Sequence, residues 1–364
     1  MPIKFQPLFT LSPKLVGLLL EIECVKEKVK HLPLTAKILG SLRESAKLMT
    51  THYSTLIEGN RLTTDEVKKV LLHKGHFPGK ELDEKEVKGY YLALEELEHL
   101  VARGSPITEK VIQTFHALVM GEGKKRVKPT PYRSGQNVIK DSQTGGIVYL
   151  PPEAKDVPGM MKGLIDWIAY QKDLPCPIVA GIAHYQYATI HPYYDGNGRT
   201  ARLLTTLILH LGGYDLKGIY SLEEYYARNL LDYYRAITVG PSHNYYLGRA
   251  EGDITQWLEY FCKGVLEAFT RAKEQMEKEK TKGSPDQGKI LRTLDPKKRK
   301  VLELFQNYEV ITNQQVIALF DFKARTGAKL CQTWTQEGFL ETVNPSRKKR
   351  EYRLGRKYQK LIFL

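Results

Sequence analysis

The segment from Ile190 to Arg202 contains the residues of this sequence that are best suited to chemistry. It reads Ile-His-Pro-Tyr-Tyr-Asp-Gly-Asn-Gly-Arg-Thr-Ala-Arg, which places an imidazole, a carboxylate, a glycine-rich turn and two guanidinium groups within thirteen residues. The ordinary pKa of histidine lies near neutrality, so His191 could act as a general base toward a hydroxyl group. Asp195 could hold a divalent cation that bridges phosphate oxygens. Together these residue types are suited to phosphate chemistry.

Two helices should position this segment. Residues 182–190 form an apolar run typical of the end of a buried helix, and Pro192 disfavours its continuation. Residues 199–211 carry leucine and isoleucine at helical spacing and are followed by two glycines. The expected structure is therefore a helix, a loop, and a second helix whose N-terminus points into the loop.

The loop is predicted to bind an anion. Gly196, Asn197 and Gly198 allow close approach of the backbone to a ligand, and a helix N-terminus offers free N–H groups and a partial positive charge. Arg199 and Arg202 are three residues apart and share a helix face, so both could hold phosphate oxygens. Each feature alone also fits a structural role, as a turn, a helix end or a solvated face. Their combination at this spacing favours binding.

Residues 191–202 closely resemble the signature of Fic-domain (Fido) proteins, His-Pro-Phe-x-Asp/Glu-Gly-Asn-Gly-Arg-x-x-Arg, with Tyr193 in place of the usual phenylalanine. Most members of this family transfer AMP from ATP to a hydroxyl side chain of a protein. The resemblance implies an enzyme, a protein adenylyltransferase that modifies serine, threonine or tyrosine of a target protein and of itself. A kinase-like activity as in Doc proteins is disfavoured, because Doc proteins depart from Gly-Asn-Gly in the anion hole.

The resemblance also implies a role for each polar residue of the segment. His191 would be the catalytic base, Asp195 would bind Mg²⁺, and Arg202 would grip the γ-phosphate. Such a transfer depends mainly on positioning and charge stabilisation. The residues that bind the phosphates of ATP would be Gly196, Asn197, Gly198, Arg199 and Arg202.

A second motif lies far upstream, at residues 54–60, and reads Ser-Thr-Leu-Ile-Glu-Gly-Asn. Ser54 and Glu58 are four residues apart and share a helix face, and the glycine and asparagine that follow are typical of a helix end. A solvated glutamate at a helix end is the plain interpretation. The motif also resembles Ser/Thr-x-x-x-Glu-Gly/Asn, the inhibitory motif of Fic proteins. That resemblance implies that Glu58 pairs with Arg202 and withdraws it from the γ-phosphate.

Residues 137–149 predict a β-hairpin, because short runs at 137–139 and 147–149 flank the turn residues 141–146. A solvent-facing hairpin is the plain interpretation. In the family, a flap of this kind aligns the target segment by strand addition, which implies that Ile147 and Val148 form the clamp. The resemblance further implies nucleoside contacts for Asn229 and Tyr233, although tyrosines at helical spacing commonly belong to a core.

The predicted fold is mainly α: a Fic helical core with a short β-hairpin flap, plus a small C-terminal winged-helix-like α+β domain. At 364 residues the chain is long enough for two or three domains. Helical patterns at 32–49, 64–72 and 83–100 predict an N-terminal helical region that carries the inhibitory motif. The expected boundaries are 1–100 for this region, 101–280 for the catalytic domain, 281–290 for a linker and 291–364 for the last domain.

Most of the positive charge lies near the C-terminus. The chain has a net charge of +14, and residues 281–364 contain 18 basic and 8 acidic residues. Expected helices at 296–307, 313–320 and 325–337, followed by a hairpin at 339–343 and 350–354, resemble a winged helix. Docking onto the Fic core or onto a protein partner is the alternative to DNA binding. The candidates for nucleic-acid contact are Arg325, Lys329, Lys348 and Lys349.

Two classes of function stay open: an ATP- and Mg²⁺-dependent adenylyltransferase, and a DNA-binding transcriptional regulator that uses the Fic core as a nucleotide sensor. Within the enzyme class, transfer of another nucleotide or removal of AMP is an alternative. Four widely spaced cysteines, no signal-peptide pattern and no apolar run long enough for a bilayer indicate a cytoplasmic protein without membrane contact. A monomer and a homodimer both fit the sequence.

Overall fold

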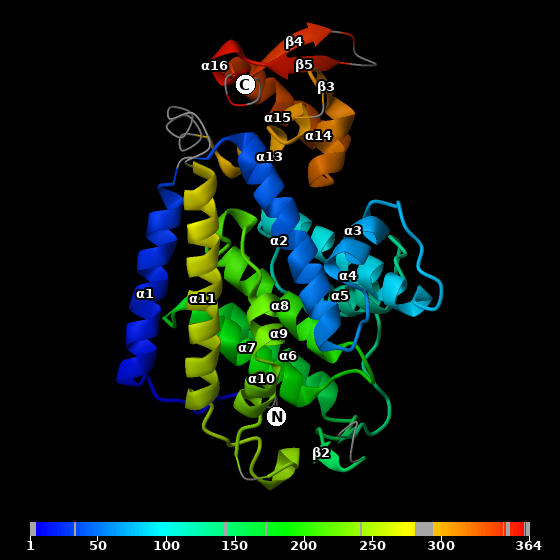
Figure 1. Ribbon diagram of the computed structural model, residues 1–364, viewed down its shortest axis with the longest axis vertical. Helices are drawn as coiled ribbons and strands as arrows, with labels where there is room; N and C mark the ends of the chain where they lie inside the picture. Colours follow the sequence, from blue (N-terminus) through cyan, green and yellow to red (C-terminus); the bar gives the residue numbers. More distant parts are fainter. Residues whose placement is uncertain are drawn as a thin grey trace.

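The computed structural model describes residues 5–32, 34–140, 145–171, 173–240, 242–280, 294–306, 308–344, 346, 350–359 and 361. Over these residues the protein is mainly helical, with one two-stranded and one three-stranded sheet (Figure 1). The predicted fold class, mainly helical with small sheets, is confirmed. No helix in the described ranges combines the length and the apolar character that a membrane span requires.

Two buried helices form the centre of the fold. Almost every side chain of α7 (Cys176–Ile190) is buried, which is typical of a helix inside a core. α8 (Asn197–Leu211) packs against α7 and ends at Gly212. Both helices agree with the sequence prediction, except that α8 begins two residues earlier than expected.

Two further helices run side by side along this centre. α11 (Thr255–Lys280) packs against α7, and α1 (Pro13–Lys30) lies along α11 (Figure 1). A Cβ atom at Gly181 of α7 would overlap Leu258 and Phe261 of α11, so this glycine allows the two helices to approach closely. α1 was not predicted from the sequence. Only one residue in every seven of this helix is fully buried, so the apolar pattern of the helix is weak. These buried residues are Leu15, Ile22 and Val29.

The inhibitory motif lies at the end of a long helix. α2 (Ala36–Ile57) begins after Thr35, whose side chain caps it, and has Glu58 as its C-terminal cap. It therefore continues well beyond the expected end at residue 49. The remaining helical elements outside the C-terminal unit are α3 (Thr64–Leu71), α4 (Glu81–Arg103), α5 (Glu109–Met120), α6 (Val157–Tyr170), η1 (Leu216–Gly218), α9 (Leu222–Arg228), α10 (Leu230–Ile237) and η2 (Tyr245–Leu247).

The predicted flap is a hairpin. β1 (Ile139–Lys140) and β2 (Ile147–Tyr149) pair in antiparallel orientation. Four residues of the predicted turn, 141–144, lie outside the described residues.

The C-terminal unit has a hydrophobic core of its own. β3 (Ile311–Thr312), β4 (Leu340–Asn344) and β5 (Glu351–Leu354) form a sheet in the order β3-β5-β4. The expected helix at 296–307 is instead α13 (Pro296–Val301) followed by a 3-10 turn, η3 (Leu304–Gln306), which brings Phe305 into this core. The other helices are α14 (Asn313–Phe320), α15 (Ala324–Gln336) and α16 (Arg356–Gln359).

The hydrophobic clusters can be compared with the expected domain boundaries. One cluster joins buried residues from Leu15 to Met276, and another holds those from Leu294 to Leu361. The expected boundary at residue 100 thus crosses a shared core, and the expected linker at 281–290 lies outside the described residues. The boundaries stay predictions.

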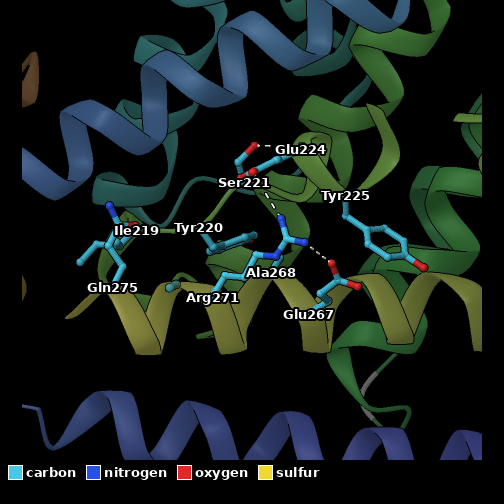
Figure 2. Close-up of a pocket in the computed structure, with 10 residues that line it drawn as sticks. Ile219, Tyr220, Ser221, Glu224, Tyr225, Glu267, Ala268, Arg271 and Gln275 are labelled. Atoms are coloured by element: carbon cyan, nitrogen blue, oxygen red, sulfur yellow. Dashed lines mark hydrogen bonds and ion pairs between the residues drawn. The ribbon is translucent and has the colours of Figure 1, made fainter. Parts of the chain in front are cut away.

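Two cavities lie away from the 190–202 segment. Figure 2 shows a small one beside Arg271, where the start of α9 faces α11. Arg271 bonds there to Glu224 and Glu267 at 3.3 and 2.5 Å. A larger cavity of about 1070 Å³ lies where α2 and α4 meet the C-terminal unit, between Arg43 and Lys300. No residue of 190–202 lines either cavity.

Candidate active site

The two central helices meet at one loop. α7 ends at His191, whose backbone is left-handed (φ 52°, ψ 61°) and whose N–H bonds to the Tyr187 carbonyl at 3.0 Å. α8 begins after Gly196, which is also left-handed, with φ 75°. Left-handed backbone is uncommon for a residue that has a Cβ atom, and such strain concentrates at functional sites. The loop from His191 to Gly196 joins the predicted base to the N-terminus of α8.

His191 is held as a neutral base. Its Nδ1 lies 3.3 Å from the Ala188 carbonyl oxygen. Because a carbonyl oxygen only accepts hydrogen bonds, Nδ1 carries the proton and the lone pair is on Nε2. Burial lowers the pKa of His191 to about 4, so the ring is neutral at pH 7. The ring can therefore take a proton from a hydroxyl group placed at Nε2.

Tyr193, the one departure from the family signature, is part of the support of the loop. Its ring is buried and stacks on His116 with the centroids 3.5 Å apart. Its hydroxyl donates to the Thr130 carbonyl at 3.3 Å. His116 Nε2 in turn lies 2.9 Å from the Asp195 carbonyl oxygen. The tyrosine thus keeps the aromatic anchor and adds a hydrogen bond.

The start of α8 has the form of an anion site. The side chain of Asn197 closes the loop, since it accepts from the Tyr193 N–H at 3.0 Å and donates to the Tyr193 carbonyl at 2.8 Å. A Cβ atom at Gly198 would overlap the carboxylate of Glu58. The glycine therefore lets an anion come close to the first turn of α8, where backbone N–H groups are free. In this structure that anion is a carboxylate of the protein itself.

Glu58 and Arg202 meet as the inhibitory motif predicts, and Ser54 also contacts Arg202. Arg202 is 1% exposed and donates from Nη2 to Glu58 Oε1 at 2.7 Å. Its other bonds run to the hydroxyl and the carbonyl oxygen of Ser54, at 2.8 and 2.9 Å. Burial alone would lower the pKa of Arg202, but the Glu58 carboxylate raises it above its ordinary range. The guanidinium is therefore charged, and it is bound by Glu58 and Ser54.

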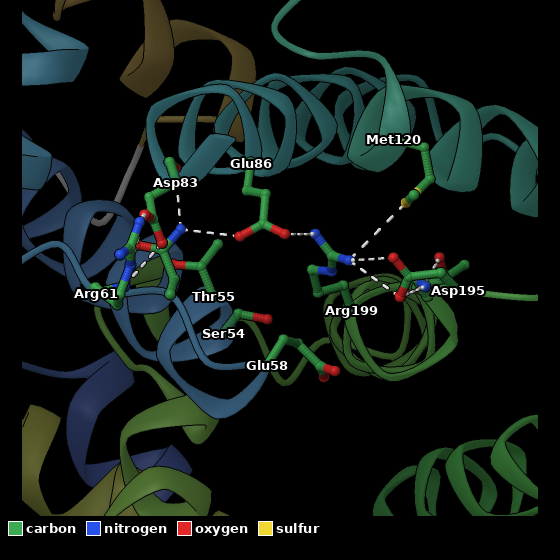
Figure 3. A network of polar contacts seen from close by, with 12 residues as sticks. Ser54, Thr55, Glu58, Arg61, Asp83, Glu86, Met120, Asp195 and Arg199 are labelled. Carbon is green, nitrogen blue, oxygen red and sulfur yellow. Dashed lines mark hydrogen bonds and ion pairs between the residues drawn. The ribbon is translucent and has the colours of Figure 1, made fainter. Parts of the chain in front are cut away.

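Arg199 has a different environment. Its buried guanidinium donates from Nη1 to Glu86 Oε1 at 3.2 Å, and Nη2 lies 3.4 Å from both carboxylate oxygens of Asp195 (Figure 3). The Asp195 side chain is 66% exposed. The structure thus places Arg199 behind Asp195 and leaves the Asp195 carboxylate open to solvent.

One known protein family matches the part of the chain that contains this loop. Residues 106–209 match the Fic/DOC family. This part of the chain resembles a Fic domain. The match begins before α5 and includes most of α8, so it contains His191 and the whole loop.

Two named relatives are similar to about half of this chain. The protein adenylyltransferase Fic of Drosophila willistoni is 31% identical over 179 residues, which are 48% of this chain and 34% of the relative. That of Nematostella vectensis is 30% identical over 198 residues, 53% of this chain and 44% of the relative. The chain thus spans less than half the length of these relatives.

The fold of almost the whole chain occurs in a solved structure. A Fic family protein from Desulfovibrio desulfuricans G20 has a TM-score of 0.60 and 22% identity over 97% of this chain and 99% of that one. A Fic domain containing signaling protein from Bacteroides thetaiotaomicron VPI-5482 has a TM-score of 0.60 and 26% identity over 71% of this chain and 97% of that one. The first likeness shows a shared fold.

Arg133 joins the hairpin to the loop that begins at His191, and it was not predicted from the sequence. Its Nε donates to the His191 carbonyl at 2.9 Å, and Nη1 donates to the Gly135 carbonyl at 3.0 Å. Nη2 donates to the Pro152 carbonyl, beyond the other end of the hairpin. Tyr149 of β2 adds a bond from its hydroxyl to the Thr189 carbonyl at 2.7 Å. No spacing in the sequence signals these contacts.

The residues expected to contact the target protein and the nucleoside of ATP differ in how far they are buried. Ile147 and Val148 are exposed on β2, as a docking strand requires. Tyr233 is buried, with its hydroxyl 3.0 Å from His184 Nε2. Asn229 is half-buried and donates from Nδ2 to the Tyr225 carbonyl at 3.0 Å, between α9 and α10. Their roles stay predictions.

The nucleic-acid candidates are described only in part. Arg325 and Lys329 are exposed on α15, together with Gln332. Lys348 and Lys349 lie outside the described residues.

Proposed function

We propose that this protein is an adenylyltransferase that transfers AMP from ATP to the hydroxyl group of a serine, threonine or tyrosine. The observation that carries the proposal is the neutral His191, with its Nε2 lone pair available, at the loop that opens onto the first turn of α8. The names of the relatives support the reaction type.

In the proposed reaction, His191 Nε2 takes the proton of the target hydroxyl. The oxygen then attacks the α-phosphorus of ATP, the bond from that phosphorus to the bridging oxygen of the β-phosphate breaks, and diphosphate leaves. The first turn of α8 would stabilise the phosphate charge with backbone N–H groups, and Arg202 would hold the γ-phosphate. The protein supplies position and charge for this step and forms no covalent intermediate.

Asp195 is the residue that would hold Mg²⁺. Among the described residues no three His, Cys, Asp or Glu side chains gather into a metal site. Mg²⁺ commonly takes one or two carboxylates and completes its shell with water and substrate phosphates, and the open Asp195 carboxylate fits that role. The ion would neutralise charge on the phosphates.

Autoinhibition by Glu58 is part of the proposal. The Glu58 carboxylate lies at the first turn of α8 and binds Arg202. The first turn of α8 and Arg202, which would each bind phosphate, are therefore both occupied before ATP binds. Separation of Glu58 from Arg202 would free the first turn of α8 and Arg202 at the same time. The flap, through Ile147 and Val148, would then align a target segment, including one from another copy of this chain.

The test compares wild type, Glu58→Gly and His191→Ala with Mg²⁺ and each of the four nucleoside triphosphates, followed by intact-mass analysis. The proposal expects an AMP-sized increment from ATP that is larger in Glu58→Gly and absent in His191→Ala. An increment from another nucleotide would assign that nucleotide instead. No increment in any sample would contradict the enzyme.

A second candidate function is DNA binding by the C-terminal unit. It is favoured by the exposed Arg325, Lys329 and Gln332 on α15, beside a three-stranded sheet. Titration of short duplexes at increasing salt tests it, because phosphate contacts give affinity that falls steeply with salt. Equal binding by wild type and an Arg325→Ala, Lys329→Ala double variant would contradict it.

A further inference from the structure

Glu86 of α4 lies between the turn after α2 and Arg199 of α8 (Figure 3). One carboxylate oxygen accepts from Asn60 Nδ2 at 2.9 Å, and the other accepts from Arg199 Nη1 at 3.2 Å. Asn60 follows Glu58 by two residues. We propose that Glu86 is a positioning residue of the nucleotide site: it orients Arg199 and, through Asn60, holds the inhibitory turn. This inference rests on the proposed function.

Both partners of Glu86 can only donate to it. A guanidinium has no acceptor. The amide of Asn60 is fixed, because its Oδ1 accepts from the Leu62 N–H at 3.1 Å and its Nδ2 also donates to the Asp83 carbonyl at 2.9 Å. A carboxylate accepts on both oxygens, whereas the amide of a glutamine accepts on one. The isosteric variant Glu86→Gln can therefore keep only one of the two contacts.

The contact with Arg199 bears on the proposed cation ligand. Arg199 is buried, and among the described residues its Nε has no hydrogen-bond partner, so the guanidinium depends on the carboxylates around it. Glu86 lies on one side and Asp195 on the other. Without Glu86, Arg199 would bind the Asp195 carboxylate more strongly. It would then compete with the cation for that carboxylate. Loss of Glu86 should thus weaken binding of ATP when Mg²⁺ is present, and much less when it is absent.

The contact with Asn60 bears on inhibition. The turn after α2 passes through Gly59, with φ 94°, and Asn60 ties it to α4 through Asp83 and Glu86. A carboxylate at position 60 would face the Glu86 carboxylate and repel it. Asn60→Asp should therefore loosen the turn that holds Glu58 while Glu86 keeps Arg199.

A neighbouring ion pair gives a matched control. Arg61 donates from Nη2 to Asp83 Oδ2 at 2.7 Å, on the same turn and the same helix, and does not contact Glu86. Arg61→Gln removes this pair and leaves both contacts of Glu86 in place.

The experiment uses the full chain with Glu86→Gln, Asn60→Asp or Arg61→Gln, each with Glu58 and in the Glu58→Gly background. ATP binding is measured by calorimetry with Mg²⁺ and with EDTA, AMP incorporation by intact mass, and folding by the melting temperature. In the Glu58→Gly background, loss of the bond to Arg199 in Glu86→Gln should weaken binding with Mg²⁺ by about tenfold or more, the size expected for one bond to a charged group. Binding in EDTA should change little.

With Glu58 present, Asn60→Asp should raise AMP incorporation, and Arg61→Gln should not. Because Glu86→Gln must lose one of its two contacts, unchanged ATP affinity in Mg²⁺ in the Glu58→Gly background together with unchanged AMP incorporation when Glu58 is present would overturn the positioning role. An equal rise in Arg61→Gln and Asn60→Asp would overturn the role toward the turn. If Glu58→Gly itself binds no ATP, the proposed function fails, and this inference fails with it.

Discussion

Removal of the Glu58 carboxylate should change stability and nucleotide affinity in opposite directions. In Glu58→Gly, the buried Arg202 keeps its two bonds to Ser54 and loses the one at 2.7 Å to Glu58. The carboxylate is 27% exposed, so water replaces part of the interaction. The lost pair is worth about 1–3 kcal/mol. The free energy of unfolding without ATP should fall by that amount.

The same free energy should appear as a gain in ATP affinity, since ATP no longer has to displace Glu58. A gain of about 1–3 kcal/mol corresponds to roughly 5- to 150-fold tighter binding. Denaturant unfolding gives the stability, and calorimetry with Mg²⁺ gives the affinity. Glu44→Ala is the control, because it removes an exposed carboxylate from the same helix without touching Arg202. If Glu58→Gly is as stable as wild type and binds ATP no better, the reasoning is refuted.

Three further predictions concern the base, the cation and the flap. The pKa of His191 is lowered to about 4, so kcat/KM for self-modification should stay nearly constant from pH 8 to pH 5.5 and fall as the ring gains a proton near pH 4; an inflection near 6.5 in the pH profile would contradict this. Asp195→Asn should raise the Mg²⁺ concentration for half-maximal AMP incorporation by about tenfold or more, measured against EDTA-treated protein; an unchanged Mg²⁺ requirement would remove Asp195 as the ligand. Arg133→Lys cannot reach all three carbonyls at once, so self-modification should slow by about tenfold while calorimetry shows unchanged ATP affinity; equal rates in both proteins would show that the clamp on His191 is dispensable.

The loop between the two central helices could be predicted from the sequence because the residues that define it are close together in the chain. His191, Asp195 and the glycines lie within a few residues of each other, and the two flanking helices have clear stop signals in Pro192 and the glycines after Leu211. The inhibitory motif at residues 54–60 was also local. Its contact with Arg202 spans 144 residues and followed only from the family resemblance, which the structure confirms as a contact.

The residues that hold the loop were not predictable in this way. Arg133 and Glu86 act on backbone carbonyls or on residues far along the chain, and no spacing connects them to His191. The extent of α2 was underestimated for a different reason. Thr51 and Thr55 interrupt the apolar pattern, yet both are buried, because their hydroxyls donate to carbonyls within the helix.

The central claim is that the group transferred is AMP and that His191 takes the proton. The most direct measurement incubates Glu58→Gly with ATP radiolabelled at either the α- or the γ-phosphorus, and compares it with Glu58→Gly, His191→Ala. We expect protein-bound label from the α-position alone, and we expect it to be lost in the double variant. Label from the γ-position, or α-label that persists without His191, would contradict it.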